Sequence, residues 1–296
     1  MKKSKKNIIL LLIVSLIIYM TGCVGKMTAS ESNDLTIKMV VKKSNHEFWE
    51  VVNMGAQAAA KEFNVIVDFE GPTDEEDIDG QIRMVAAAIE EKADAIVLAA
   101  SDYERLVDVA EKAVLEGIPV IIIDSNINSD KMVSFVGTDN IDAGILLGTT
   151  LVESIGEKGK IAVINFVKGA ATASEREKGL RSVIDQYPNI NVVETLYCNS
   201  DELLAKSQTI DIINTYGAVD AIVCLNAYAT VGAARAIDSI SLLRPVKIIG
   251  FDIVPEEVSF LEKGVIESLV IQNPFNMETT EKDHVLQFGN WSFYYV

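Results

Sequence analysis

The stretch Asp94–Asn126, DAIVLAASDYERLVDVAEKAVLEGIPVIIIDSN, decides the fold of this chain. It opens with an apolar run, Ala95–Leu98, and continues with a segment of helical period, Tyr103–Glu116, that Gly117 ends. A second apolar run, Pro119–Ile123, follows. Apolar strands without polar alternation are those covered on both faces, as in a parallel sheet. A helix between two such strands predicts a right-handed β-α-β unit.

The same alternation continues on both sides of this stretch, from Leu35 to Ile271. It falls into two series, and the second begins after Thr138–Asn140. The series predict an α/β fold of two similar, Rossmann-like, doubly wound parallel-sheet lobes. Ligands of such sheets collect outside the carboxyl ends of the strands. Two lobes that face each other therefore form a cleft, and we expect that cleft to close around a ligand.

Composition and charge exclude several classes of protein. The 296 residues are 49% hydrophobic and carry 26 Lys and Arg against 43 Asp and Glu, a formal net charge of −17. The apolar content excludes disorder, and the acidic charge argues against nucleic acid as a partner because phosphate binding needs clustered Lys and Arg. The three cysteines, Cys23, Cys198 and Cys224, suggest neither a disulfide framework nor a zinc site.

Residues 1–22 have the layout of a secretory signal, with a basic start, an apolar stretch over Ile8–Met20 and small residues before Cys23. The Thr-Gly-Cys ending resembles a bacterial lipoprotein signal, which implies cleavage before Cys23 and a diacylglyceryl thioether on its sulfur. Residues 23–34 then form a polar tether. An uncleaved N-terminal anchor is the alternative, and in both cases the rest of the chain lies outside the cytoplasm.

Side chains suited to a polyol follow the predicted strands at their carboxyl ends. Carboxylate and amide groups pair with vicinal hydroxyls, which both donate and accept hydrogen bonds, and an aromatic face covers the C–H patch of a sugar ring. The candidate ligand-binding residues are Lys42, His46, Phe48, Trp49, Asp124, Ser125, Arg176, Asn226, Asp252 and Gln272.

These residues also have ordinary structural interpretations. The alternatives are helix caps for Asp124 and Asp252, core aromatics for Phe48 and Trp49, a solvated strand edge for Lys42 and a solvated helix face for Arg176. Gly71–Thr73 and the acidic run that follows it are interpreted as a turn and the acidic start of a helix over Glu75–Lys92.

Enzyme and cofactor motifs are absent from the sequence. With two histidines, His46 and His284, there is no Ser-His-Asp set to propose. No His/Cys cluster has metal-ligand spacing, and there is no glycine-rich phosphate loop. We therefore expect no cofactor, no metal and no enzymatic activity.

From about Leu35 to Met277 the chain resembles type I periplasmic sugar-binding proteins, the ribose-binding-like solute receptors of ABC transporters. The motifs that carry the resemblance, in order, are Lys42–Trp49, Asp94–Leu98, Gly117–Val120 leading to Asp124, Val136–Asn140, Arg176–Gly179, Asn226, Gly250–Asp252 and Gln272–Pro274. The resemblance implies a sugar-ring clamp by Phe48 and Trp49, and hydroxyl binding by Asp124, Arg176, Asn226, Asp252 and Gln272. It also implies hinge crossovers at Thr138–Asn140 and Gln272–Pro274, which adds Thr138 to the candidate site residues.

Three positions depart from the ribose receptors. His46 stands where Asn is usual, Ser125 where Arg is usual and Ala227 where Asp is usual. These departures argue against ribose itself as the ligand. Lys42 and the stretch Glu70–Thr73 look closer to receptors for the furanosyl autoinducer signal and for deoxy sugars.

The sequence after Met277 leaves the family pattern and ends in WSFYYV, residues 291–296, which suggests a frameshift or a truncation. The predicted division assigns residues 35–138 and 273–296 to the first lobe and residues 139–272 to the second. The first lobe would then lack its last helix and a third hinge strand.

Together, these observations predict a monomeric extracytoplasmic lipoprotein that captures a small sugar or polyol in the interlobe cleft and passes it to an ABC permease. The same lobes would also suit a receptor for a sugar or furanosyl autoinducer that presents its closed form to a sensor kinase or chemoreceptor. An exported α/β hydrolase that uses paired acids, such as Asp124 and Asp252, is a third possibility. A sugar-responsive repressor would need a DNA-binding module, for which residues 1–34 have no room.

Replacing Cys23 by Ser tests the lipoprotein signal. We expect the Cys23→Ser protein to be released from the membrane, because the thioether cannot form on a hydroxyl. The measurement is the membrane-bound fraction of the full chain after cell fractionation. Tight membrane association of the variant would favour the uncleaved anchor.

Overall fold

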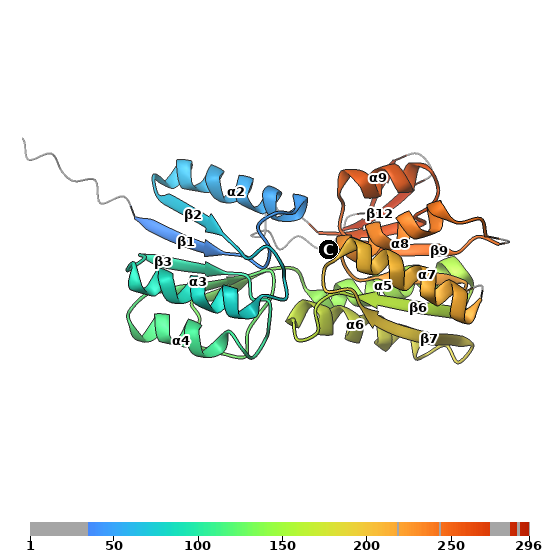
Figure 1. Ribbon diagram of the computed structural model, residues 1–296, viewed down its shortest axis with the longest axis horizontal. Coiled ribbons are helices and arrows are strands. Elements are labelled where there is room, and N and C mark those ends of the chain that lie inside the picture. The colour runs from blue at the N-terminus through green and yellow to red at the C-terminus, as the bar shows by residue number, and fades with distance from the viewer. Residues whose placement is uncertain (1–34, 218, 243, 273–284, 289–290, 296) are drawn as a thin grey trace, which may run out of the picture. The chain divides into compact units, whose positions relative to one another are not determined.

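The computed structural model describes residues 35–217, 219–242, 244–272, 285–288 and 291–295, the last two segments as backbone strands only. It contains two sheets, each flanked by helices (Figure 1). The predicted signal, the tether with Cys23, and residues 273 and 274 of the second predicted hinge lie outside the described residues. Within the described part of the chain, no helix is long and apolar enough to cross a bilayer.

The first sheet has five parallel strands in the order β2-β1-β3-β4-β5. Its elements are β1 Thr36–Val40, α2 Glu47–Phe63, β2 Ile66–Glu70, α3 Ile78–Glu90, β3 Ala95–Leu98, α4 Val107–Leu115, β4 Val120–Ile123 and β5 Ser134–Val136. Helix α2 covers one face through Trp49 and Val52, and α3 and α4 cover the other face (Figure 1). This sheet and its helices form the first lobe.

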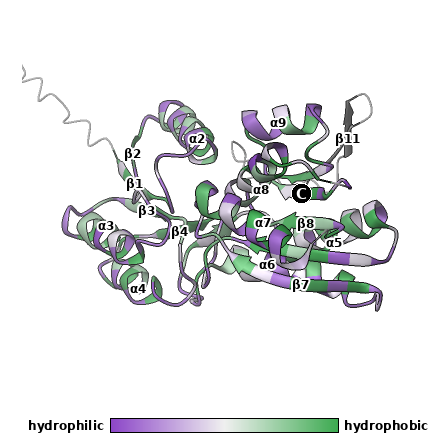
Figure 2. Ribbon diagram, turned by 45° about the vertical axis from the view of Figure 1, so that its right-hand side comes forward, coloured by the Kyte–Doolittle hydropathy of each residue, from purple (hydrophilic) through white to green (hydrophobic). Residues whose placement is uncertain are grey.

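The second sheet has seven strands in the order β11-β12-β10-β9-β8-β6-β7, and only the β11–β12 pair is antiparallel. Its elements are α5 Asn140–Ile155, β6 Gly159–Asn165, α6 Ala171–Ile184, β7 Ile190–Tyr197, α7 Glu202–Tyr216, β8 Ala221–Cys224, α8 Ala227–Ser239, β9 Lys247–Phe251, α9 Pro255–Glu262, β10 Ser268–Ile271, β11 Val285–Phe288 and β12 Trp291–Tyr295. Every residue of β8 is buried, as expected for a central strand covered on both faces, and this strand has the hydrophobic colour in Figure 2. This sheet and its helices form the second lobe.

The predicted fold class, two parallel-sheet α/β lobes, is confirmed, and three details differ. The sequence pattern did not reveal β5, because three residues are too few to show a period. Several helices begin at other residues than predicted. The described part of the tail, β11 and β12, pairs through β12 with β10 in the second sheet, whereas the predicted division placed it in the first lobe.

Five helices begin at a side chain that accepts a hydrogen bond from a backbone N–H of the first turn, which stabilises the helix start. These caps are His46, Asp77, Asp139, Asp201 and Asn226. Because Asp77 caps α3, that helix begins at Ile78 rather than at the predicted Glu75. Glu75 therefore belongs to the preceding loop, where it is only 4% exposed.

Glycines allow α5 and α6 to pack closely in the second lobe. A Cβ atom on Gly179 would lie 2.1 Å from the carbonyl oxygen of Ile141, and one on Gly144 would lie 2.2 Å from the carbonyl oxygen of Arg176. No larger residue fits at either position without a backbone shift. The close approach brings Arg176 on α6 within reach of Asn140 at the start of α5.

Candidate functional site

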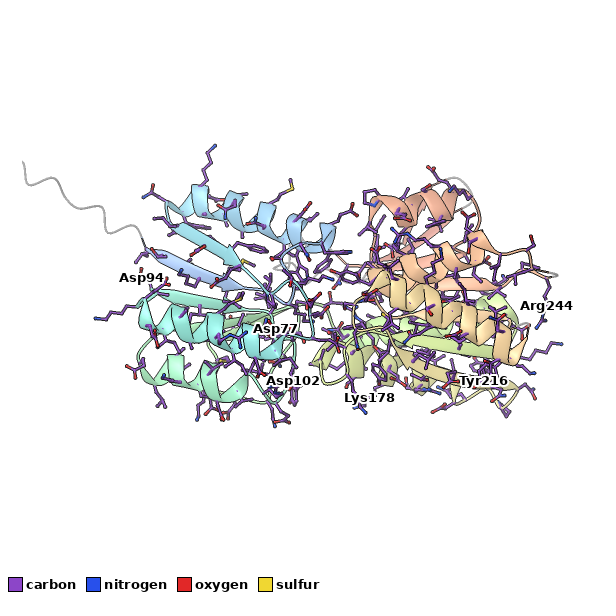
Figure 3. All side chains as sticks on the ribbon, viewed as in Figure 1. Asp77, Asp94, Asp102, Lys178, Tyr216 and Arg244 are labelled. Carbon is purple, nitrogen blue, oxygen red and sulfur yellow. The ribbon has the colours of Figure 1, made fainter. Side chains whose placement is uncertain are left out.

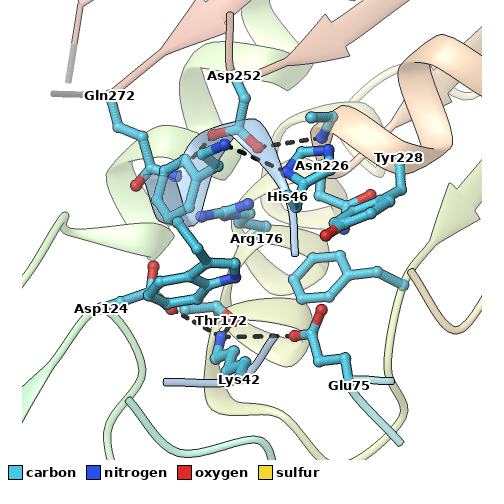
Figure 4. Close-up of a pocket in the computed structure, with 14 residues that line it drawn as sticks. Lys42, His46, Glu75, Asp124, Thr172, Arg176, Asn226, Tyr228, Asp252 and Gln272 are labelled. Atoms are coloured by element: carbon cyan, nitrogen blue, oxygen red, sulfur yellow. Dashed lines mark hydrogen bonds and ion pairs between the residues drawn. The ribbon is translucent and has the colours of Figure 1, made fainter. Parts of the chain in front are cut away.

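A pocket lies where carboxyl ends of strands from both lobes meet (Figure 4). Its empty volume, including space open to solvent, is about 360 Å³. The residues that line it are Lys42, His46, Phe48, Trp49, Glu75, Asp124, Phe166, Thr172, Arg176, Asn226, Ala227, Tyr228, Asp252 and Gln272.

Nine of the eleven residues predicted for the site line this pocket. The other two, Ser125 and Thr138, do not. Ser125 is buried beside Asp124, and its hydroxyl has no hydrogen-bond partner among the described residues. The Thr138 hydroxyl donates to Gln272 Oε1 at 2.9 Å, so it links the segment between β5 and α5 to the residue that follows β10.

Lys42 and Asp124 form a buried ion pair, with 2.7 Å between Lys42 Nζ and Asp124 Oδ2. Lys42 Nζ also donates to Thr172 Oγ1 at 3.1 Å, across to the second lobe. A solvated strand edge is therefore the wrong interpretation of Lys42, which is 3% exposed. Asp124 keeps one carboxylate oxygen outside this pair, and it can accept from a ligand hydroxyl.

Asp252 occupies the matching position in the second lobe, directly after β9. Its Oδ1 accepts from Gln272 Nε2 at 2.7 Å, and its Oδ2 accepts from the Ala227 N–H at 3.0 Å at the start of α8. Neither it nor Asp124 caps a helix that follows it in sequence, so the capping interpretation was wrong. Both have left-handed backbones, with φ of 77° for Asp252 and 57° for Asp124, a strained conformation typical of functional sites.

Arg176 is buried in the pocket wall, at 3% exposure. Its Nε donates to Asn140 Oδ1 and its Nη1 to the Leu225 carbonyl oxygen, both at 2.8 Å. The guanidinium lies 3.7 Å from the ring centroid of Phe251. Lys178, two residues later on α6, is exposed and points away from the fold, so the solvated-face interpretation holds for Lys178 and fails for Arg176 (Figure 3).

Aromatic rings supply the apolar part of the pocket. Phe48 and Trp49 meet edge to face, with ring centroids 5.0 Å apart. His46 and Tyr228, from opposite lobes, stack with centroids 3.9 Å apart. Trp49 also belongs to the buried core under α2, so the core and site interpretations of this residue both hold.

The sequence analysis missed five lining residues: Glu75, Phe166, Thr172, Ala227 and Tyr228. Phe166 directly follows β6, and Ala227 and Tyr228 begin α8 after β8, so the strand-end rule could have found all three. Thr172 lies at the start of α6, and no sequence signal distinguishes it. Glu75 was hidden by the acidic run that resembles a helix start.

The pocket concentrates charge away from water. Two cationic and three acidic side chains, Lys42, Arg176, Glu75, Asp124 and Asp252, are each between 3% and 6% exposed. Burial raises the pKa of Asp252, and the positive charge of Arg176 opposes the rise. Burial likewise raises the pKa of Glu75 against the charge of Lys42. Among the described residues, no group of His, Cys, Asp and Glu side chains is arranged to hold a metal ion.

Comparison with known proteins places the chain in a family. The profile of the family described as "Periplasmic binding protein domain" matches residues 37–280. A solute-binding protein from Agrobacterium vitis with bound D-fucose is 33% identical, with a TM-score of 0.79 over 82% of this chain and 85% of that chain. A sugar transporter from Clostridium phytofermentans is 38% identical, with a TM-score of 0.75 over 81% and 88% of the two chains. The D-allose-binding periplasmic protein of Escherichia coli (strain K12) is 24% identical over 250 residues, 82% of this chain and 80% of that protein.

The chain therefore belongs to the periplasmic binding protein family, and within it to the type I sugar-binding proteins. These relatives are sugar-binding transport proteins rather than enzymes, and the chain is not an enzyme on that ground. The family also places it outside the cytoplasm.

His46 makes the site sensitive to acid. Burial lowers the pKa of His46 to about 4, and the nearby charge of Lys43 contributes. Its Nδ1 accepts from the Phe48 N–H at 3.3 Å to cap α2, which requires an unprotonated nitrogen. Since the unfolded chain binds this proton near pH 6.5, stability from His46 is present above that pH and is lost as pH falls toward 4.

We expect the unfolding free energy of the wild type, relative to that of a His46→Asn variant, to fall by about 2 kcal/mol from pH 7 to pH 5, because Asn caps the helix without titrating. Urea unfolding at the two pH values measures this difference. An unchanged difference would show that His46 is not held neutral by its surroundings.

Proposed function

We propose that the pocket captures one small, uncharged polyhydroxylated solute, a monosaccharide, and that the protein delivers it to an ABC importer. The main observation in support is that acidic, amide and guanidinium groups from both lobes lie beside aromatic rings in one buried pocket. Asp124, Arg176, Asn226, Asp252 and Gln272 each have a partner in the protein and capacity left for a ligand, as hydroxyls that both donate and accept require.

Three groups have defined roles in this proposal. Asp252 accepts from ligand hydroxyls, because the bonds from Gln272 and Ala227 leave lone pairs free on both oxygens. Arg176 donates through the N–H groups that Asn140 and Leu225 do not use. Phe48 and Trp49 contact the apolar face of the sugar ring. Because these groups come from both lobes, a bound sugar favours the closed arrangement through its higher affinity for it.

Relatives support a monosaccharide and differ in which one they bind. The Agrobacterium vitis protein holds D-fucose, and the Escherichia coli protein is named for D-allose. His46, Ser125 and Ala227 depart from ribose receptors, so we favour a hexose or a deoxy sugar over ribose.

We further propose that Cys23 carries a lipid that holds the protein at the outer face of the cell membrane. Residues 1–22 would be removed as the signal and residues 23–34 would form the tether. The two lobes would be separated by hinges at Thr138–Asn140 and near Gln272. The bond between Thr138 and Gln272 supports this pairing of the hinges.

Replacing Asp252 by Ala tests the function. A thermal-shift screen over D-fucose, D-allose, D-ribose, D-arabinose and D-tagatose identifies the sugar that raises the melting temperature most. Calorimetry with that sugar should then show a loss of about 2–4 kcal/mol in binding free energy, because a buried charged acceptor is removed. Exposed Asp94 is the matched control, and Asp94→Ala should bind normally. Near-normal affinity of the Asp252 variant, or no shift with any sugar, would contradict the proposal.

A further inference from the structure

We propose that Glu75 both selects the ligand and holds the two lobes together, with one carboxylate oxygen for each task. Glu75 lies in the loop between β2 and α3 of the first lobe and lines the pocket. This inference extends the proposed sugar-binding function to a further specificity-determining residue.

One oxygen of Glu75 reaches the second lobe. Its Oε2 accepts a short hydrogen bond from the Ser200 hydroxyl, in the loop after β7. Lys43 of the first lobe donates to the Ser200 carbonyl oxygen at 3.2 Å. Ser200 is fully buried, and both it and Asn199 have left-handed backbones. The strained turn therefore presents the Ser200 hydroxyl and carbonyl to two side chains of the opposite lobe.

The same contact extends to a pocket residue of the second lobe. Asn226 Nδ2 donates to Ser200 Oγ at 3.1 Å, while Asn226 Oδ1 caps α8 by accepting from the Ala229 N–H. Ser200 thus connects Glu75 in one lobe with Asn226 in the other. The Ser200 bonds already hold Glu75 and Asn226 close together. A ligand that contacts both side chains therefore stabilises the arrangement in which the lobes touch, and that arrangement in turn favours ligand binding.

The other oxygen of Glu75 lacks a donor. Its Oε1 lies 3.9 Å from Lys42 Nζ, too far for a hydrogen bond, and no other described residue donates to it. The side chain is 4% exposed, and the pocket that it lines is where a donor can reach this oxygen. Buried acceptors are normally satisfied, and this one borders the pocket. We assign the missing donor to the ligand, as a hydroxyl group that points toward Glu75.

This assignment makes a statement about substrate class. An analogue that lacks the hydroxyl facing Glu75 leaves a buried carboxylate unsatisfied, and sites of this kind reject such analogues strongly. Removal of Glu75 therefore weakens binding of the complete sugar and abolishes discrimination against one particular deoxy analogue. A purely structural role would weaken both ligands by the same factor.

The first test uses the full chain with Glu75→Ala, Ser200→Ala and, as a control, Glu76→Gln at the exposed neighbouring position. The probes are D-allose, or D-fucose if it gives the larger thermal shift, and the monodeoxy analogues of that sugar. We expect Glu75→Ala to weaken the parent sugar about 10- to 100-fold, and to weaken one monodeoxy analogue only by the smaller factor seen in Ser200→Ala, because both variants lose the same lobe contact. Ser200→Ala should weaken all probes by a similar, smaller factor. Equal losses for every analogue in Glu75→Ala would overturn the ligand assignment.

The second test needs no ligand. Hydrogen exchange of the free protein should be faster at residues 198–201 in both Glu75→Ala and Ser200→Ala, and unchanged in Glu76→Gln. Unchanged exchange in Glu75→Ala would overturn the lobe contact. If exchange at residues 198–201 is faster in both variants but the wild type binds none of the sugars, the lobe contact stands. The ligand role of Glu75 and the proposed function are then both refuted, so failure of the contact and failure of the function are distinguishable.

Discussion

The structure depends on keeping charged groups buried where two sheets meet. Charges removed from water are costly unless partners satisfy them. Here Lys42 is paired with Asp124, Arg176 is held by Asn140 and the Leu225 carbonyl oxygen, and Asp252 accepts from Gln272 and Ala227. These partners orient each group and leave part of its hydrogen-bonding capacity unused. A ligand rich in hydroxyls can make the hydrogen bonds that these groups do not make within the protein.

The backbone prepares this arrangement in both lobes in the same way. Asp124 follows β4 and Asp252 follows β9, and each turns into the left-handed region directly after its strand. That turn places the carboxylate at the strand end rather than at the start of the next helix. The close packing of α5 on α6 positions Arg176 in a similar way, because it holds the guanidinium on α6 beside Asn140 on α5.

Much of the fold could be predicted from the sequence, and the limits have physical causes. Apolar runs such as Val120–Ile123 identify strands because both faces of a parallel sheet are covered. The three residues of β5 are too few to show a period. Glu75 was assigned to a helix start because an acidic run before a helix has the same composition as an acidic loop that enters a pocket. Asp124, Asp252 and Arg176 were predicted for the site through strand ends and family resemblance together. Composition alone would have left Arg176 on the surface, since the neighbouring Lys178 is indeed exposed.

A crystal structure of the protein with the sugar that stabilises it most tests the central claim directly. The account predicts one unmodified monosaccharide in the pocket, with its ring against Phe48 and Trp49 and its hydroxyls within hydrogen-bond distance of Asp252 and Arg176. A sugar bound elsewhere on the molecule, or one that leaves these four side chains without contact, would contradict it.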